Sequence, residues 1–366
     1  MSKPDGMVKT ESMSKRRRLS TAQDLADSGL IAAAELPQLR PVQSALAIGV
    51  SDHLARLMLD SPRHSALRRQ YIPDPRELRV TEAELADPIG DAAHSPVKGL
   101  VHRYPDRVLL KIANVCAVYC RYCFRREMIG PQAETLGMAE KEDAYSYIRA
   151  HPEIREVILT GGDPMVLSTR QIGAALAALS AIPHIRFIRI HSRVPIADPL
   201  RIDADYIQKL RENMNGKPLY IALHVNHTDE LSAEVCKVIE ALHAEGCMLL
   251  SQSVLLCGVN DSLEALENLF TALTALHVKP YYLHHPDLAR GTAHFRLPLH
   301  EGMALYERLR GRLSGICIPE YMLDIPGGYG KIPVNHSYVR VDGENTYTLR
   351  DPQGGTHIYH DDCAAS

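Results

Sequence analysis

The sequence predicts an α/β protein in which helices cover a mostly parallel sheet. Between residues 107 and 284, short apolar segments alternate about six times with segments of helical periodicity. The short segments are too uniformly apolar for strands that expose one face to water, which is typical of parallel strands. The chain has 366 residues, 45% of them apolar, so it can bury a large core. An open doubly wound sheet and a curved partial barrel share this pattern, and the alternation does not separate them.

The N-terminal quarter has a different pattern. Residues 1–19 are polar and include four consecutive basic residues, which we interpret as a solvated, disordered tail. Residues 20–95 are expected to form a helical region and a connector, because apolar residues recur there at helical spacing. Interruptions are predicted at Pro37 and Pro41, and the proline-rich stretch 71–96 is expected to be extended.

The alternating core is expected over residues 96–298, followed by a C-terminal segment over 299–366. Its strands are predicted at 107–113, 156–160, 186–190, 219–224, 248–254 and 280–284. Its helices are predicted at 138–150, 169–181, 203–214, 231–244 and 262–276. In folds of this class, ligands bind at the carboxyl ends of the parallel strands, so the functional residues are expected there.

Composition narrows the class of function. The net charge of −3 and the pI of about 6.7 give no basis for binding nucleic acid or a membrane surface. No apolar run is long enough to cross a membrane, and the N-terminus lacks the apolar core of a secretory signal. Eight cysteines, three of them clustered, suit a reducing compartment. We therefore expect a cytoplasmic protein.

Cys116, Cys120 and Cys123 form the motif C-x3-C-x2-C. Four thiolates would complete a zinc site or ligate every iron of a cubane cluster, whereas three leave one iron open to a small molecule. The alternatives are a zinc site completed by a distant histidine and three unconnected thiols. The spacing resembles the radical S-adenosylmethionine (radical SAM) superfamily, in which the open iron of a [4Fe–4S] cluster binds S-adenosylmethionine.

Several polar residues follow the predicted strands. Gly161 and Gly162 permit close backbone approach, and Asp163 offers an acceptor for an ammonium group, although an ordinary turn has the same composition. His191 follows the next strand. The pair His224 and His227 follows the one after, either as a metal pair or, as we prefer, as part of a pocket lining.

A glycine-rich loop precedes Lys331. It is not a Walker motif, since the glycine spacing differs and no Ser or Thr follows the lysine. A lysine on such a loop can form a Schiff base with pyridoxal 5′-phosphate (PLP). A phosphate-binding loop or a tight turn with an exposed lysine is the alternative.

Further short motifs occur in a fixed order, at 103–107, 124–126, 161–164, 252–256, 280–282, 294–296 and 326–331. Together they resemble the lysine 2,3-aminomutase family of radical SAM enzymes over about residues 96–334. The resemblance implies a partial (β/α)6 radical SAM barrel with a helical N-terminal region and a short C-terminal segment that carries the PLP lysine.

The resemblance also implies roles for individual residues. The [4Fe–4S] ligands would be Cys116, Cys120 and Cys123. Residues that contact S-adenosylmethionine would be Gly161, Gly162 and Asp163. Lys331 would bind PLP, and the residues around its phosphate would be Arg103, Tyr104 and Arg107. Arg125 would bind the substrate carboxylate, and the ε-ammonium of lysine would be bound by Asp287 and Asp324.

These roles imply an isomerase that converts L-lysine to β-lysine by 2,3-migration of the amino group. The alternatives are a β-lysine-forming enzyme of the elongation factor P modification pathway and an aminomutase for another amino acid. The resemblance further implies a reductant such as flavodoxin or ferredoxin, and it is compatible with a homo-oligomer. Cys317 and Cys363 do not rebuild the cysteine motif of the long clostridial type, so we expect no structural zinc.

Overall fold

The computed structural model describes residues 18–61, 65–130, 133, 135–335, 337–343, 345–351 and 354–360. The predicted disordered tail therefore lies outside the described residues as far as residue 17. Its last two residues form β1 (Arg18–Leu19), which pairs with β2 (Val50–Ser51) in an antiparallel ladder. The end of the predicted tail is thus part of the folded N-terminal region.

The described part of the N-terminal region contains four short α-helices: α1 (Ala22–Asp27), α2 (Leu36–Ala45), α3 (Asp52–Leu59) and α4 (Ala66–Tyr71). The predicted interruptions at Pro37 and Pro41 are wrong, because both prolines lie inside α2. Pro37 occupies the first turn, where no intrahelical donor is needed. Pro41 is exposed, so water can satisfy the carbonyl group that its missing N–H leaves without a partner.

One nine-stranded sheet organises residues 100–333, in the order β11-β10-β9-β8-β7-β6-β5-β4-β3. The strands are β3 (Leu100–Tyr104), β4 (Arg107–Ala113), β5 (Glu156–Gly161), β6 (Phe187–Ser192), β7 (Leu219–His224), β8 (Met248–Val254), β9 (Lys279–His284), β10 (Glu320–Ile325) and β11 (Gly330–Pro333). Strands β4 to β10 are parallel, and β3 and β11 are antiparallel edges. The six predicted strands correspond to β4 to β9. The sequence analysis missed β3, β10 and β11.

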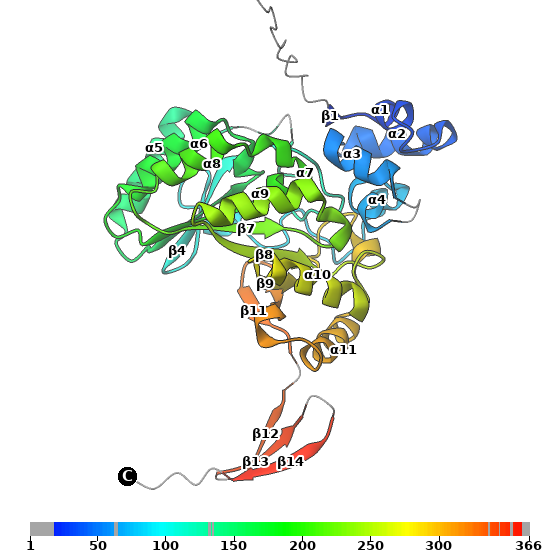
Figure 1. Cartoon of the computed structure of the whole chain (residues 1–366), viewed down its shortest axis with the longest axis vertical. Coiled ribbons are helices and arrows are strands. Elements are labelled where there is room, and N and C mark those ends of the chain that lie inside the picture. The colour runs from blue at the N-terminus through cyan, green and yellow to red at the C-terminus, as the bar shows by residue number, and fades with distance from the viewer. Residues whose placement is uncertain are drawn as a thin grey trace, which may run out of the picture.

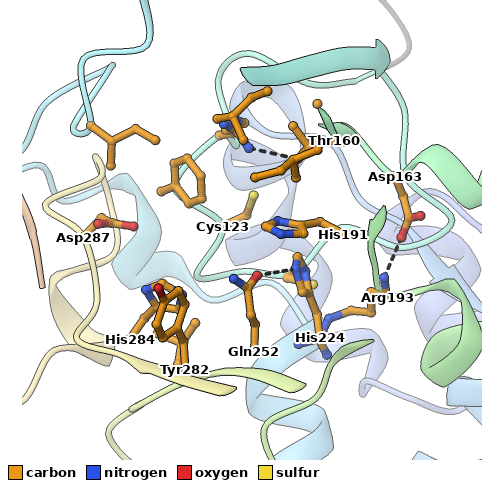
Figure 2. Close-up of a pocket in the computed structure, with 18 of the residues that line it drawn as sticks. Cys123, Thr160, Asp163, His191, Arg193, His224, Gln252, Tyr282, His284 and Asp287 are labelled. Carbon is orange, nitrogen blue, oxygen red and sulfur yellow. Dashed lines mark hydrogen bonds between the residues drawn. The ribbon is translucent and has the colours of Figure 1, made fainter. Parts of the chain in front are cut away.

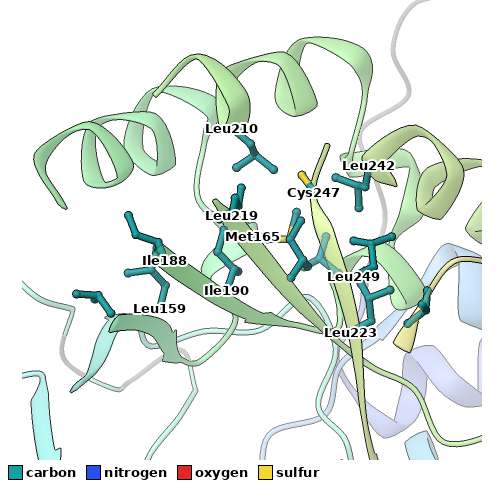
Figure 3. Packing of buried hydrophobic residues seen from close by; sticks show 14 of the residues in the cluster. Leu159, Met165, Ile188, Ile190, Leu210, Leu219, Leu223, Leu242, Cys247 and Leu249 are labelled. Atoms are coloured by element: carbon teal, nitrogen blue, oxygen red, sulfur yellow. The ribbon is translucent and has the colours of Figure 1, made fainter. Parts of the chain in front are cut away.

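The helices between these strands cover the outer face of the sheet (Figure 1). They are α5 (Met138–Ala150), α6 (Thr169–Ser180), α7 (Val194–Ala197), α8 (Ala204–Glu212), α9 (Ala233–Ala244), α10 (Leu263–Ala275) and α11 (Leu299–Arg310). Figure 3 shows Ile188 and Ile190 on the strand face that packs toward Leu210 of α8, deep in the apolar core.

The opposite face of the sheet lines a cavity, so the strands are apolar toward the helices and carry polar residues such as Arg189, His191 and Gln252 toward the cavity. In β5, Val157 and Leu159 belong to the core under the helices, whereas Ile158 and Thr160 border the cavity. The two edge strands meet where the N–H of Lys331 in β11 donates to the hydroxyl of Tyr104 in β3, at 2.9 Å. This contact between edges shows a curved partial barrel and excludes the open doubly wound sheet.

A separate antiparallel sheet follows, formed by β12 (Val339–Gly343), β13 (Thr346–Arg350) and β14 (Thr356–His360), and it extends away from the barrel (Figure 1). The prediction made for Cys363 lies outside the described residues. None of the helices in the described part of the chain has the length and apolar character that a membrane crossing requires.

Candidate active site

The inside of the curved sheet holds a cavity of about 450 Å³. Every residue that the sequence analysis assigned to the site lines this one cavity: Arg103, Tyr104, Arg107, Cys116, Cys120, Cys123, Arg125, Gly161, Gly162, Asp163, Asp287, Asp324 and Lys331. Figure 2 shows Cys123, His191, His224 and Asp287 around a common space. The thiols and the lysine amine, which come from distant parts of the chain, therefore face the same chamber.

The cysteine motif lies in the loop that follows β4. Its three thiols are free, and burial raises the pKa of each, to about 11 for Cys123. Within the described ranges, no three His, Cys, Asp or Glu side chains converge as ligands of a single metal ion. Three free thiols that line one chamber are a donor set that fits an iron–sulfur cluster with one open iron.

Buried ion pairs hold the cysteine loop in place. Arg121 pairs with Glu77 at 2.6 Å and donates to the carbonyl of Ala47 at 2.8 Å, and Arg126 pairs with the same glutamate. Arg18 donates to the carbonyl of Cys116 at 3.1 Å. The N-terminal region and the connector therefore help to fix the loop backbone.

Lys331 is the second residue of β11 and lies opposite Asp324 of β10 in the antiparallel register. Its ammonium group forms an ion pair with the Asp324 carboxylate. The side chain is 29% accessible because it borders the cavity. Burial lowers the pKa of Lys331 to about 8, although the Asp287 carboxylate acts in the opposite direction. A lysine amine with a lowered pKa is better able to react with a carbonyl cofactor at neutral pH.

The two candidate carboxylates differ in their surroundings. Burial raises the pKa of Asp287 to about 6, against the charges of Lys331, Arg125 and Arg103. Asp324 is buried, and its Oδ1 has no hydrogen-bond partner but lies 3.7 Å from Arg103 Nη1. Both residues line the cavity, and Oδ1 of Asp324 keeps its acceptor capacity.

The residues predicted around the PLP phosphate are close to Lys331. Arg103 donates to the carbonyl of Ile89, while its buried Nε has no hydrogen-bond partner. Arg107 stacks on the ring of Tyr104, with its guanidinium carbon 4.0 Å from the ring centre. Two guanidinium groups, a hydroxyl and a lysine amine form a set that fits an aldehyde cofactor with a phosphate.

Comparison with known proteins agrees with this geometry. The radical SAM superfamily model matches residues 110–270, and the lysine-2,3-aminomutase model matches residues 306–363. The L-lysine 2,3-aminomutase of Clostridium subterminale is 35% identical over 344 residues, covering 94% of this chain and 82% of that protein.

The chain belongs to the lysine 2,3-aminomutase family.

The L-lysine 2,3-aminomutase of Fusobacterium nucleatum is likewise 35% identical, covering 94% of this chain and 80% of its own length. The glutamate 2,3-aminomutase of Clostridioides difficile is 35% identical over 77% of this chain and 66% of its own. Proteins of this family are isomerases with a radical SAM domain. The predicted cofactors, a [4Fe–4S] cluster, S-adenosylmethionine and PLP, are those of the family.

In this member of the family, the glycine–aspartate segment after β5 is engaged by the protein itself. A Cβ at Gly161 or Gly162 would collide with the backbone before the cysteine loop, so the glycines permit that packing. The Asp163 carboxylate accepts four hydrogen bonds, of 2.7–3.1 Å, from the hydroxyl of Ser192 and from the N–H groups of Met165, Arg193 and Val194. Four bonds fill its acceptor capacity. The Asp163 carboxylate therefore fixes the backbone around this segment, and the contact of Gly161, Gly162 and Asp163 with S-adenosylmethionine stays a prediction.

The two histidines of the predicted pair, His224 and His227, have different surroundings. His224 and His191 line the cavity with ring centres 5.8 Å apart, as pocket-lining residues should. Burial lowers the pKa of His224 to about 3 and that of His191 well below its ordinary value. His227 instead accepts from the N–H of Asp229 at 3.2 Å and caps a short helix. The two histidines of the His224–His227 pair therefore do not both face the cavity.

Sequence reasoning missed two buried acids. Glu230 pairs with Arg193 at 2.6 Å and accepts from Tyr71 and Gln70 of α4, which joins the N-terminal region to the barrel. Asp91 lies in the predicted connector and pairs with Arg125. The connector has no periodic pattern that would predict the Asp91 contact, and the Glu230 contact joins residues about 160 positions apart.

Proposed function

We propose that the protein converts L-lysine to β-lysine by moving the amino group from Cα to Cβ. The observation that carries this proposal is the shared cavity, in which the three thiols and the Lys331 amine face Arg125 and the carboxylates Asp287 and Asp324. The cavity brings together the donors for all three cofactors and groups of both charges for a diamino acid.

The two carboxylates favour lysine as the substrate. A second ammonium group in a water-poor cavity requires opposite charge, because an unpaired buried charge is strongly unfavourable. An aminomutase for glutamate would need cations at these positions. Relatives that are named for lysine and for glutamate both show 35% identity, so identity does not separate the substrates. Asp287 and Asp324 do distinguish the substrates, because two carboxylates favour a substrate with a second ammonium group over one with a second carboxylate.

The protein's own groups hold and orient the reactants. We assign the cluster to the three cysteines, PLP to Lys331, and the PLP phosphate to Arg103, Tyr104 and Arg107. Arg125 would bind the substrate carboxylate in the bidentate manner of a guanidinium group. When bound, the cluster and S-adenosylmethionine supply the radical that removes a hydrogen atom, and PLP spreads the unpaired electron. The enclosed barrel would keep water from the reacting atoms.

The same proposal includes a low-potential flavodoxin or ferredoxin as the electron donor. The glycine-rich loop before Lys331 favours a metabolic aminomutase over the elongation factor P branch, which the resemblance associates with a different form of that loop.

Anaerobic incubation of the reconstituted protein with L-lysine, S-adenosylmethionine, PLP and reductant tests the proposal. The expected products are β-lysine and, in small amounts, 5′-deoxyadenosine, with no aminomutase product from L-glutamate. Release of deoxyadenosine without β-lysine would reject lysine as the substrate and keep the radical chemistry.

A further inference from the structure

Asp91 is a shared counter-ion for three cations at the active site. Its side chain is buried, and its Oδ2 accepts from Arg125 Nη2 at 2.8 Å and from Arg125 Nε at 3.3 Å. The same oxygen lies 3.9 Å from Lys111 Nζ, and Oδ1 lies 3.5 Å from Arg103 Nη2. These cations lower the pKa of Asp91, although burial alone would raise it. Asp91 is therefore held as a carboxylate between two of the assigned ligand-binding arginines.

The contacts of Arg125 determine which of its donors remain available. A guanidinium group has five N–H donors, one on Nε and two on each Nη. Asp91 takes the Nε donor and one of the Nη2 donors, and the Thr160 hydroxyl takes one Nη1 donor at 3.4 Å. One donor is left on each Nη nitrogen. A carboxylate that accepts from both Nη nitrogens binds a guanidinium group in the bidentate manner.

The turn that carries Asp91 is fixed to the loop that carries Lys331. The Asp87 carboxylate accepts from the N–H of Asp91 at 3.0 Å, so the turn is internally braced. Gly90, in the left-handed region at φ +65°, packs so closely on Gly327 and Gly328 that a Cβ would lie 2.8 Å from their backbone atoms. The ring of His94 contacts the carbonyl of Gly328 at 3.1 Å. Asp91 thus occupies a defined place relative to Lys331 as well as to Arg125.

We propose that Asp91 is a positioning residue that fixes the edge of Arg125 presented to the substrate carboxylate. The inference rests on the proposed role of Arg125 in binding that carboxylate. Asp91 acts through Arg125 and does not itself contact substrate. Its replacement should therefore weaken recognition of the carboxylate specifically, and leave recognition of the two amino groups unchanged.

Calorimetric binding to the cofactor-loaded protein, without reductant, tests this. L-lysine is compared with 1,5-diaminopentane, which has both amino groups and no carboxylate. In Asp91→Asn, the dissociation constant for lysine is expected to rise about tenfold or more, the effect of losing a charge-assisted hydrogen bond, while that for the diamine stays unchanged. Equal weakening for both ligands, or unchanged lysine binding, would overturn the inference.

Two further variants separate positioning from charge and from stability. Asp91→Asn combined with Lys111→Met restores the net charge of the site, so it guards against loss of folding in the single variant. It is expected to show the same loss of selectivity, and recovery of selectivity would show that only charge balance mattered. Glu84→Gln removes a buried partner of Arg296, at 2.8 Å, outside the cavity, and should lower the melting temperature but keep the selectivity.

The outcomes also distinguish this inference from the proposed function. If the wild-type protein prefers lysine to the diamine but does not convert it to β-lysine, the proposed function fails. The binding test then still shows whether Asp91 positions Arg125. If the wild-type protein shows no preference, the role of Arg125 fails and the inference fails with it.

Discussion

Asp287→Asn is expected to stabilise the free protein while it removes lysine binding. The Asp287 carboxyl has a pKa of about 6 in place of the ordinary 3.8, chiefly because burial disfavours its charge. A tenfold change in an ionisation constant corresponds to about 1.4 kcal/mol, so the ionised group lowers the free energy of unfolding by about 3 kcal/mol at pH 8. The amide lacks this charge. Because the pKa of about 6 already includes the favourable charge of Lys331, we expect a net gain of about 3 kcal/mol at pH 8.

The pH dependence makes this expectation specific. Between pH 3.8 and about 6, the unfolded chain has released the Asp287 proton and the folded protein still holds it. The wild-type protein therefore loses stability as the pH rises through this range, and the loss is complete above pH 6. The advantage of Asp287→Asn should be largest above pH 6 and should shrink toward pH 4.

Chemical denaturation of the cofactor-free wild-type and variant proteins at pH 4.5 and pH 8 measures the difference. Lysine binding is measured in parallel on the loaded protein. It should be lost in the variant, and in the wild-type protein it should weaken as the pH falls below 6. A variant that is less stable than wild type at pH 8, or a stability difference that does not vary with pH, would refute the reasoning. It would show that the ionised Asp287 carboxylate does not lower the free energy of unfolding.

Three other variants, one of them with a matched control variant, test the cofactor site and the contacts that hold it in place. Lys331→Ala removes the amine assigned to PLP, so the protein should lose the cofactor's visible absorbance and keep its iron, and retained absorbance would contradict the assignment. Gly90→Ala places a Cβ 2.8 Å from the backbone of the lysine loop and should lower the free energy of unfolding by about 2–3 kcal/mol. Gly216→Ala, at a similar φ of +75° with nothing within 4 Å, is its control and should lose only about 1 kcal/mol. Arg18→Met removes the donor to the Cys116 carbonyl and should reduce the iron retained after anaerobic reconstitution, with unchanged far-UV circular dichroism.

Local sequence patterns predicted much of the fold and many of the candidate residues. The strands β4 to β9 and the helices between them follow from periodicity, which each segment expresses by itself. The three cysteines and Lys331 are recognisable because their spacing and glycine neighbours are local features too. The missed strands β3, β10 and β11 lie where apolar runs are short and interrupted by turn residues, so the signal there is weak.

Tertiary structure alone decided how these parts meet. The hydrogen bond that joins the sheet edges links Tyr104 and Lys331 across 227 positions, and no periodicity extends that far. Asp91 reaches Arg125 across 34 positions from a connector without regular structure. The Asp163 carboxylate is of the type that accepts from a bound ammonium group, but in the folded protein it accepts from backbone and hydroxyl donors. Only folding brings those donors near. Sequence determined which groups the protein has, and the long-range ion pairs and hydrogen bonds determined which of them remain free to bind.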